Sequence, residues 1–376
     1  MPATPAPWQP STNFLASAAI RAIFHPTLLL IAGVHAGSAT ISHPARAASE
    51  PPAVPQVAPG VWRVTTPLPF RPTQVHAWVV QLADGGAMLV DGGLNTPEAW
   101  SALDAGVHAA AGGWDAVRIH VVTHMHMDHV GLAARAAQAS GATVVMHRLD
   151  VERMAHAAAH PDDEADYRAA LLRRAGAPDE VLRAVEAARQ GAEGLAPPVA
   201  ADVMLDGESG ELDGAPGWRW LWTPGHTAGH LSLFRAEDGV LIAGDAVLPR
   251  ITPTLGVNRQ RADPVGDYGA ALHRLLALAP SLVLPGHGDP IADGSGRIAE
   301  LLAAADAESD TVAGLLGDDG LTCWQVVDRR YPGREMGVST RMLAVRETLA
   351  HLDRLAAAGR AVVAEDEHGA ARFAAR

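Results

Sequence analysis

The stretch "VTHMHMDHVG", Val122 to Gly131, places three histidines and one aspartate within ten residues. An apolar run comes directly before it, and an alanine-rich pattern with helical spacing comes directly after it. Histidine is the side chain that most often binds metals at neutral pH, and a carboxylate is a hard oxygen ligand. We therefore take a metal site as the first hypothesis for this segment.

The surroundings of this stretch predict an α/β fold. From Val61 onward, short apolar or alternating runs predict β-strands, and the glycines of "ADGG" and "DGG" are typical of turns that close β-hairpins. Residues 96–111 have helical spacing, with Pro97 at a plausible first position. The opening stretch thus follows a buried strand and precedes a helix. This places its side chains on a loop at the end of a sheet, where α/β folds carry their sites.

Three later segments also end predicted strands on a histidine or an aspartate, namely "WRWLWTPGHTAGHLSLF", "GVLIAGDAV" and "PSLVLPGHGDP". Chance would scatter such residues over helices and exposed faces as well, so the combination indicates a metal site more strongly than the opening stretch does alone. For that stretch alone, the alternative is a polar loop with one structural histidine. The candidate ligands are His124, His126, Asp128, His129, His226, Asp245 and His287.

The motifs "THMHMDH", "TPGHTAGH", "GD" and "PGHG" resemble, in order and spacing, those of the metallo-β-lactamase superfamily of metal-dependent hydrolases, over about residues 61–293. The resemblance implies an αββα sandwich with the site along one sheet edge. It also implies two metal ions. The set makes physical sense, since three neutral imidazoles leave one open position on a tetrahedral zinc, and two close cations can share a hydroxide near neutral pH. The implied ligands are His124, His126 and His226 for the first metal, and Asp128, His129 and His287 for the second, with Asp245 bridging them.

The same resemblance gives Asp128 a catalytic role. It would bind the second metal, orient the nucleophile and later protonate the leaving group. We expect two Zn²⁺ ions, with iron or manganese as alternatives.

Departures from the family pattern narrow the expected substrate. The best-known antibiotic-hydrolysing class has a cysteine ligand, but Cys323 lies outside the motifs and Asp245 occupies the matching position. His126 differs from the acidic residue of flavodiiron relatives, and the roughly forty residues from Asp245 to His287 leave no room for the inserted domain of beta-CASP nucleases. What remains resembles the glyoxalase II and thioesterase type, so we expect a small-molecule thioester or related acyl substrate.

Two rival functions stay open at this point. One is an endoribonuclease or phosphodiesterase that holds single-stranded RNA, for which a steep salt dependence of binding would be the sign. The other is a mononuclear iron sulfur dioxygenase, which keeps the same first three ligands.

A few further residues have predicted roles near the site. Arg250 follows Asp245 closely enough to line the pocket and bind a substrate carboxylate or phosphate, although an exposed loop charge is an equal alternative. His230 is expected to orient its loop by hydrogen bonding and not to bind metal. Structural roles are expected for His76, His120 and His147.

Composition limits the function classes. The chain has 376 residues, 48% of them hydrophobic, which is enough for one large domain and something smaller. A net charge of −13 argues against the nucleic-acid backbone as the main partner. Lysine is absent, which excludes Schiff-base and P-loop lysine chemistry, and a single cysteine excludes intrachain disulfides and thiolate metal clusters.

Three units are predicted along the chain. Residues 1–58 are a signal-like or disordered extension, with "TLLLIAGVHAGSA" as a possible signal core and "ARA" as a cleavage site. The apolar run is too short to span a bilayer, so we expect no stable membrane association. A cytoplasmic location is expected, or a periplasmic or secreted one if the segment is a signal peptide. The metallo-β-lactamase domain covers 59–295, with a helical insertion at 148–200 that is either a lid over the site or a helix pair on the outer face.

The third unit, residues 296–376, reads as three helices followed by a hairpin that turns near His368. This order is a winged-helix pattern, and it resembles the C-terminal module of the lactamase-beta-like branch of the superfamily. The acidic "EDE" at the wing weakens the case for nucleic-acid binding. Nucleic acid is therefore the less favoured partner, and packing or homodimer formation is the preferred role.

Overall fold

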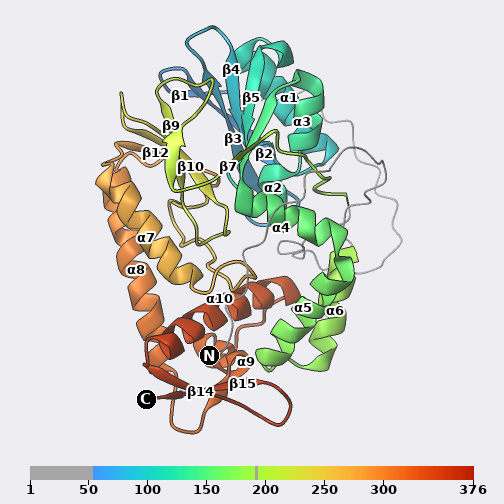
Figure 1. Ribbon diagram of the computed structural model, residues 1–376, viewed down its shortest axis with the longest axis vertical. Coiled ribbons are helices and arrows are strands. Elements are labelled where there is room, and N and C mark those ends of the chain that lie inside the picture. Colours follow the sequence, from blue (N-terminus) through green and yellow to red (C-terminus); the bar gives the residue numbers. More distant parts are fainter. Residues whose placement is uncertain (1–53, 191–193) are drawn as a thin grey trace, which may run out of the picture.

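Two β-sheets lie face to face in the upper part of the protein as drawn in Figure 1. The structure is a computed structural model that describes residues 54–190 and 194–376. Within these residues the first sheet has seven strands, which follow one another in chain order, and the second has five, in the order β12-β11-β10-β9-β8. The first sheet contains β1 (Gln56–Ala58), β2 (Val61–Pro67), β3 (Gln74–Gln81), β4 (Ala87–Val90), β5 (Val117–Val121), β6 (Thr143–His147) and β7 (Val203–Leu205). The second contains β8 (Ser209–Glu211), β9 (Trp218–Trp222), β10 (Leu231–Arg235), β11 (Val240–Gly244) and β12 (Leu282–Pro285).

Helices cover the outer face of each sheet. On the first sheet they are α1 (Pro97–Ala111) and α3 (Ala133–Ser140), with the short η1 (Trp114–Ala116) and α2 (Met127–Val130) beside them. On the second sheet they are α7 (Pro264–Ala277) and the first half of α8 (Gly294–Gly314). The predicted α/β fold with an αββα sandwich is therefore confirmed.

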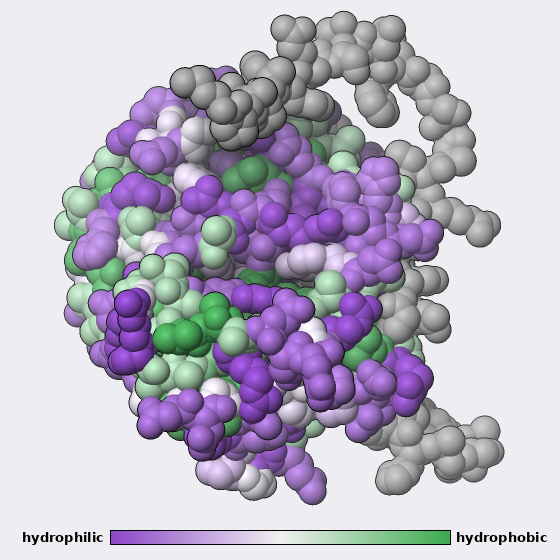
Figure 2. All heavy atoms as spheres, turned by 60° about the horizontal axis from the view of Figure 1, so that its bottom comes forward, coloured by the Kyte–Doolittle hydropathy of each residue, from purple (hydrophilic) through white to green (hydrophobic). Residues whose placement is uncertain are grey.

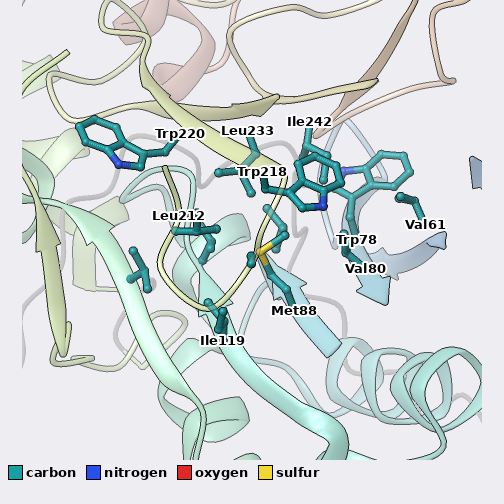
Figure 3. Close-up of a cluster of buried hydrophobic side chains, with 14 of the residues drawn as sticks. Val61, Trp78, Val80, Met88, Ile119, Leu212, Trp218, Trp220, Leu233 and Ile242 are labelled. Atoms are coloured by element: carbon teal, nitrogen blue, oxygen red, sulfur yellow. The ribbon is translucent and has the colours of Figure 1, made fainter. Parts of the chain in front are cut away.

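Alternation along the strands builds the core between the sheets (Figure 3). On β3, Trp78 and Val80 point into the space between the sheets, whereas Ala77 and Val79 pack under α1. Trp218 of β9 fills the same inner layer from the other sheet. Each fully buried side chain of this size contributes about 1.5–3 kcal/mol relative to an exposed one. The sandwich is thus held by its inner layer, and the strand ends are left available for function.

The sequence predicted that the "DGG" stretch closes a β-hairpin, and the structure shows that it does not. β4 pairs with β5 in parallel, and the chain crosses from one to the other through α1. Asp91, the first residue of the stretch, has a left-handed backbone (φ 60). Aspartate tolerates this conformation better than most residues, and a strained position at a strand end is typical of functional sites.

The predicted helical insertion contains α4 (Arg148–Ala159), α5 (Pro161–Arg174) and α6 (Asp179–Gln190). It runs from the sandwich down to the C-terminal unit, and α6 packs beside α10 (Val338–Ala357) (Figure 1). Arg174 donates to Asp353 of α10 at 2.9 Å, and Ala175 is buried in the C-terminal core. The insertion is therefore neither a free flap nor a pair confined to the outer face, because it joins two parts of the molecule.

The C-terminal unit contains the second half of α8, α9 (Cys323–Arg330) and α10, with a sheet in the order β13-β15-β14. Its strands are β13 (Leu321–Thr322), β14 (Ala361–Glu365) and β15 (Ala371–Ala375). The element order is compatible with the expected winged-helix arrangement. Ile298 of α8 is buried with the sandwich and Val312 with the C-terminal core, so this helix crosses the predicted boundary at 295/296. In Figure 2, which turns this end forward, hydrophilic residues cover most of the face and hydrophobic ones form small patches.

None of the helices in residues 54–190 and 194–376 combines the length and hydrophobicity needed to cross a bilayer. Most of the predicted signal-like extension lies outside the described residues.

Candidate metal centre

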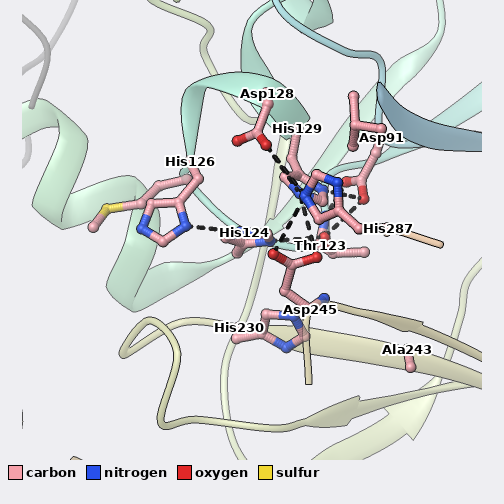
Figure 4. Close-up of polar contacts among 12 residues, drawn as sticks. Asp91, Thr123, His124, His126, Asp128, His129, His230, Ala243, Asp245 and His287 are labelled. Carbon is pink, nitrogen blue, oxygen red and sulfur yellow. Dashed lines mark hydrogen bonds and ion pairs between the residues drawn. The ribbon is translucent and has the colours of Figure 1, made fainter. Parts of the chain in front are cut away.

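The predicted ligands meet at one edge of the sandwich, where strands of both sheets end (Figure 4). The loop after β5 carries His124 and His126, and the first turn of α2 carries Asp128 and His129. The turns after β9, β11 and β12 carry His226, Asp245 and His287.

Hydrogen bonds to the main chain fix which ring nitrogen faces the centre. His226 donates through Nδ1 to the carbonyl of Thr254 at 3.0 Å, and His287 donates through Nδ1 to the carbonyl of Gln74 at 2.8 Å. A carbonyl only accepts hydrogen bonds, so each Nδ1 carries the proton and each Nε2 presents a lone pair. This orientation is the one that metal-binding histidines adopt.

Asp91 orients two further buried rings, that of His129 directly and that of His124 through the Thr123 hydroxyl. Its Oδ2 lies 2.8 Å from Nδ1 of His129 and also accepts a hydrogen bond from the Thr123 hydroxyl, at 2.8 Å. That hydroxyl lies 3.0 Å from Nδ1 of His124, where it can accept, because its own proton goes to Asp91. Nε2 of His124 then faces Nδ1 of His126 at 3.1 Å.

Several buried atoms in the described part of the chain lack a hydrogen-bond partner, and four of them face this centre. Buried polar atoms are normally satisfied, so four unsatisfied ones that face the same point fit a position where an ion can bind. Possible ligand atoms lie within 4.8 Å of one another in the set His124, His126 and His226 and again in the set Asp128, His129 and His287. Imidazole nitrogens with carboxylate oxygens suit zinc, iron and manganese, so the residues fit two such ions. The four unsatisfied atoms are Oδ1 of Asp128, Nε2 of His129, Nε2 of His226 and Oδ1 of Asp245.

The electrostatics favour a cation at this position. Burial lowers the pKa of His124, His126 and His226, which keeps these rings in the neutral form that binds metals. At His129, burial also acts to lower the pKa, but the carboxylates of Asp245, Asp91 and Asp128 outweigh it and raise the pKa to about 10. Without metal, the negative field of three carboxylates thus retains a proton on the ring. A bound metal ion would replace that proton.

His230 lies behind the ligands. Its Nε2 accepts the backbone N–H of Asp245 at 3.1 Å, and its Nδ1 lies 2.7 Å from the Thr223 hydroxyl. The Nε2 lone pair is therefore already used, which suits the predicted role of orienting a loop and not that of a metal ligand.

Comparison with known proteins agrees with this geometry. The family model described as "Metallo-beta-lactamase superfamily" matches residues 70–287, a range that contains every candidate ligand. The chain belongs to the metallo-β-lactamase superfamily. A crystal structure of a family protein from Thermus thermophilus has 30% sequence identity and a TM-score of 0.71, covering 85% of this chain and 100% of that one.

Two proteins from other organisms are also similar to this chain. The protein named "Probable metallo-hydrolase YqjP" of Bacillus subtilis (strain 168) is 28% identical over 300 residues, which are 78% of this chain and 91% of that protein. "Thioesterase pkgB" of Emericella nidulans is 27% identical over 128 residues, which are 34% of this chain and 35% of that protein. This second similarity covers only about a third of either chain.

Asp150 is a site residue that the sequence reasoning missed. It is fully buried in the first turn of α4, and it accepts three hydrogen bonds, from the N–H of Met125 (2.9 Å), the Thr227 hydroxyl (2.8 Å) and the N–H of Gly229 (2.7 Å). These donors flank His126 and His226, so one carboxylate joins the two ligand loops. Its position in the insertion, outside the superfamily motifs, left no signal in the sequence.

Replacing Asp150 by alanine should loosen both loops. The change leaves three donors without their acceptor, at a cost of about 1–3 kcal/mol for each one that stays buried. We expect the affinity for the first metal to fall about 10–100-fold, which isothermal titration of the metal-free protein with zinc would measure. Asp318→Ala, at an exposed loop position, is the control. Unchanged zinc affinity in Asp150→Ala would contradict the proposed role.

The other histidines singled out in the sequence lie outside the ligand set. His76 donates through Nε2 to the carbonyl of Gly288 at 2.8 Å, next to the turn that carries His287, and its Nδ1 lies 3.0 Å from the Thr65 hydroxyl. His120 contacts the carbonyl of Asp91, and His147 accepts the N–H of Leu149 at the start of α4. These contacts are structural.

A cavity of about 370 Å³ opens beside the metal centre. Its size is typical of small-molecule sites. Arg250, as the sequence suggested, lines this cavity from an exposed loop position. The ligands that form part of its wall are His126, Asp128, His226, Asp245 and His287.

Proposed function

We propose that the protein is a dinuclear, zinc-dependent hydrolase of thioesters or related acyl compounds. The observation that carries this proposal is the pair of ligand sets with Asp245 beside both, next to a cavity of small-molecule size. Membership of the metallo-β-lactamase superfamily supports hydrolysis, and the local similarity to a thioesterase supports the acyl substrate.

Most of the candidate site residues would bind the metal ions, and Asp128 would also contact the attacking water. His124, His126 and His226 would hold one ion, and Asp128, His129 and His287 the other, with Asp245 between them. When bound, the metals supply Lewis acidity that brings the pKa of water close to neutrality. Oδ1 of Asp128 is buried, has no hydrogen-bond partner and belongs to a residue that lines the cavity, so it can accept a hydrogen bond from the attacking water. It can then take up the proton that this water loses and pass it on to solvent.

The nature of the acid limits the leaving group. Burial acts to raise the pKa of the Asp128 carboxyl, but His129 and His287 hold it below its usual range, so the group is rarely protonated at neutral pH and seldom has a proton to donate. A thiolate leaves without prior protonation, because the pKa of a thiol is about 8.5. An amine or alkoxide would need, at the same place, a group that keeps its proton at neutral pH and can pass it to the leaving atom. This chemistry favours a thioester over an amide.

The proposal is tested by the metal content of protein purified without added metal, together with a thioester panel assayed before and after chelation. We expect close to two zinc ions per chain, and hydrolysis that is lost on chelation and returns with zinc. One iron per chain with thiol-dependent oxygen uptake would instead indicate the dioxygenase. Two metals with no thioester hydrolysis would rule out the acyl substrate and point to phosphodiesters and RNA.

We infer further that the C-terminal unit is a winged-helix module used for packing. Its third helix, α10, buries Val345, Leu349 and Leu352 in the module's own core, and Leu343 and Arg346 line the cavity. A helix placed in this way does not offer its face to nucleic acid. The exposed wing adds "EDE" at 365–367, which would repel phosphates.

A further inference from the structure

Helix α10 places a guanidinium next to the metal centre, although it belongs to a different unit of the chain. Arg346 lines the cavity together with His126 and His226. The same three residues also line a second, smaller cavity. A positive charge supplied by the C-terminal unit therefore lies beside the reacting groups.

The main chain holds Arg346 in place. Its Nη2 donates to the carbonyl of Val257 at 3.0 Å, and the N–H of Val257 donates back to the carbonyl of Arg346 at 3.2 Å. The side chain also packs closely on Gly256, where an added Cβ would lie 3.3 Å from the guanidinium carbon. A charge anchored in this way is preorganised, so little conformational entropy is lost when an anion binds.

The other charges on the cavity wall are arranged for an anion. Arg71 and Arg250 line it together with Arg346, whereas the carboxylates among its described lining residues are Asp128 and Asp245, both in the metal centre. This grouping contrasts with a chain whose net charge is −13. Between the arginines the wall is apolar, and is formed by Pro72, Leu248, Pro249, Ile251, Pro253 and Leu343.

Arg346 sits in an environment that disfavours its charge. Burial lowers the pKa of this guanidinium, and although Tyr167 acts in the opposite direction, Arg153 lowers it further by repulsion. Charge-assisted hydrogen bonds to a guanidinium are among the strongest in proteins, so an anion that reaches Arg346 from the cavity can be bound tightly.

We propose that Arg346, with Arg250 at the mouth of the cavity, forms an anion-binding subsite for a carboxylate or phosphate carried by the substrate. The inference rests on the proposed function and specifies it: the substrate is an acyl compound with an apolar body and an anionic group. The C-terminal unit would thereby determine specificity in an active site built by the metallo-β-lactamase domain.

Three thioesters distinguish the sources of the anion. Hexanoyl N-acetylcysteamine is neutral. Adipyl N-acetylcysteamine has an acyl chain of the same length that ends in a carboxylate. Hexanoyl-coenzyme A has the neutral acyl chain and carries its phosphates in the coenzyme A half of the molecule. We expect the zinc-loaded wild type to prefer one of the two anionic substrates. In Arg346→Gln, the kcat/KM for this preferred anionic substrate, divided by the kcat/KM for the neutral substrate, should fall about 10–100-fold. The fall should come mainly from a higher KM for the anionic substrate, because a charge-assisted hydrogen bond is lost.

Matched variants separate this effect from damage to the fold. Arg341→Gln removes an arginine of the same helix that pairs with Asp328 and lies outside the described cavity lining, so the ratio should stay at the wild-type value. Arg346→Lys keeps the charge and should restore part of the preference. If Arg346→Gln does not fold, Arg250→Gln at the exposed mouth repeats the test with a smaller expected drop.

Failure of the subsite and failure of the proposed function give different results. Hydrolysis of all three thioesters with the same ratio in wild type and Arg346→Gln would overturn the subsite and leave the function standing. If the wild type cleaves none of them, the thioester proposal fails, and calorimetric titration of the zinc-loaded proteins with adipate and with inorganic phosphate decides on the subsite. Binding that Arg346→Gln weakens at least tenfold would support it, and equal binding by both proteins would overturn it.

Discussion

Asp128→Ala abolishes hydrolysis, with an expected fall in kcat of about 10²–10⁴-fold, the range that a positioned acid or base contributes. Asp128 is 2% exposed, and its Oδ2 lies 3.3 Å from Nε2 of His287. Burial acts to raise its pKa, but His129 and His287 outweigh burial and hold the pKa well below its usual range. The group is therefore a carboxylate at every working pH, ready to accept a hydrogen bond from water.

The decisive measurements for this variant are kcat on a thioester, metal content and the circular dichroism spectrum. Zinc at the first site should remain, because His124, His126 and His226 are untouched, and the spectrum should match that of the wild type. Asp318→Ala should keep full activity. If Asp128→Ala retained more than a tenth of the wild-type kcat, another group would have to take the proton, and the assignment of Asp128 would be wrong.

Gly286→Ala is expected to cost at least about 10²-fold in kcat, the penalty that a displacement of about 1 Å can cause at a reacting centre. A Cβ at Gly286 would lie 2.4 Å from Oδ1 of Asp245 and 2.6 Å from Cε1 of His129. Real Cβ atoms do not approach this closely, so the carboxylate of Asp245 and the ring of His129 must both shift. We expect the bound zinc to fall below two ions per chain at micromolar free zinc.

Gly269→Ala in α7 is the matched control, because a Cβ there meets nothing within 4 Å. It should leave zinc content and kcat unchanged, and the helical alanine should raise the free energy of unfolding by about 0.4–1 kcal/mol. Wild-type zinc binding and kcat in Gly286→Ala would show that the ligands tolerate the added methyl group. The close packing of Gly286 against Asp245 and His129 would then not be needed for metal binding or for activity.

The ligands were predictable because each one follows a recognisable strand. Apolar runs such as "VLIAG" end on a polar residue, and strand ends gather at one edge of an α/β sheet, so their proximity follows from a local pattern. The residues that support the ligands gave no such signal. Asp91 stood in a stretch typical of a hairpin turn, and only the parallel pairing of β4 with β5 brings it to His129 and Thr123. Asp150 lies in the helical insertion, which the sequence predicted as a lid or as an outer helix pair and not as a source of residues that support the ligands.

The sequence by itself determined the fold class and the candidate metal ligands, because hydrophobic periodicity and residue type are properties of short segments. It did not determine how the insertion and the C-terminal unit meet the sandwich. Only the tertiary structure shows that α10 brings Arg346 to the cavity wall, across roughly a hundred residues of chain from Asp245. Contacts of this kind depend on how amphipathic helices dock, and a polar residue on such a helix has the same local pattern whether it faces solvent or a binding site.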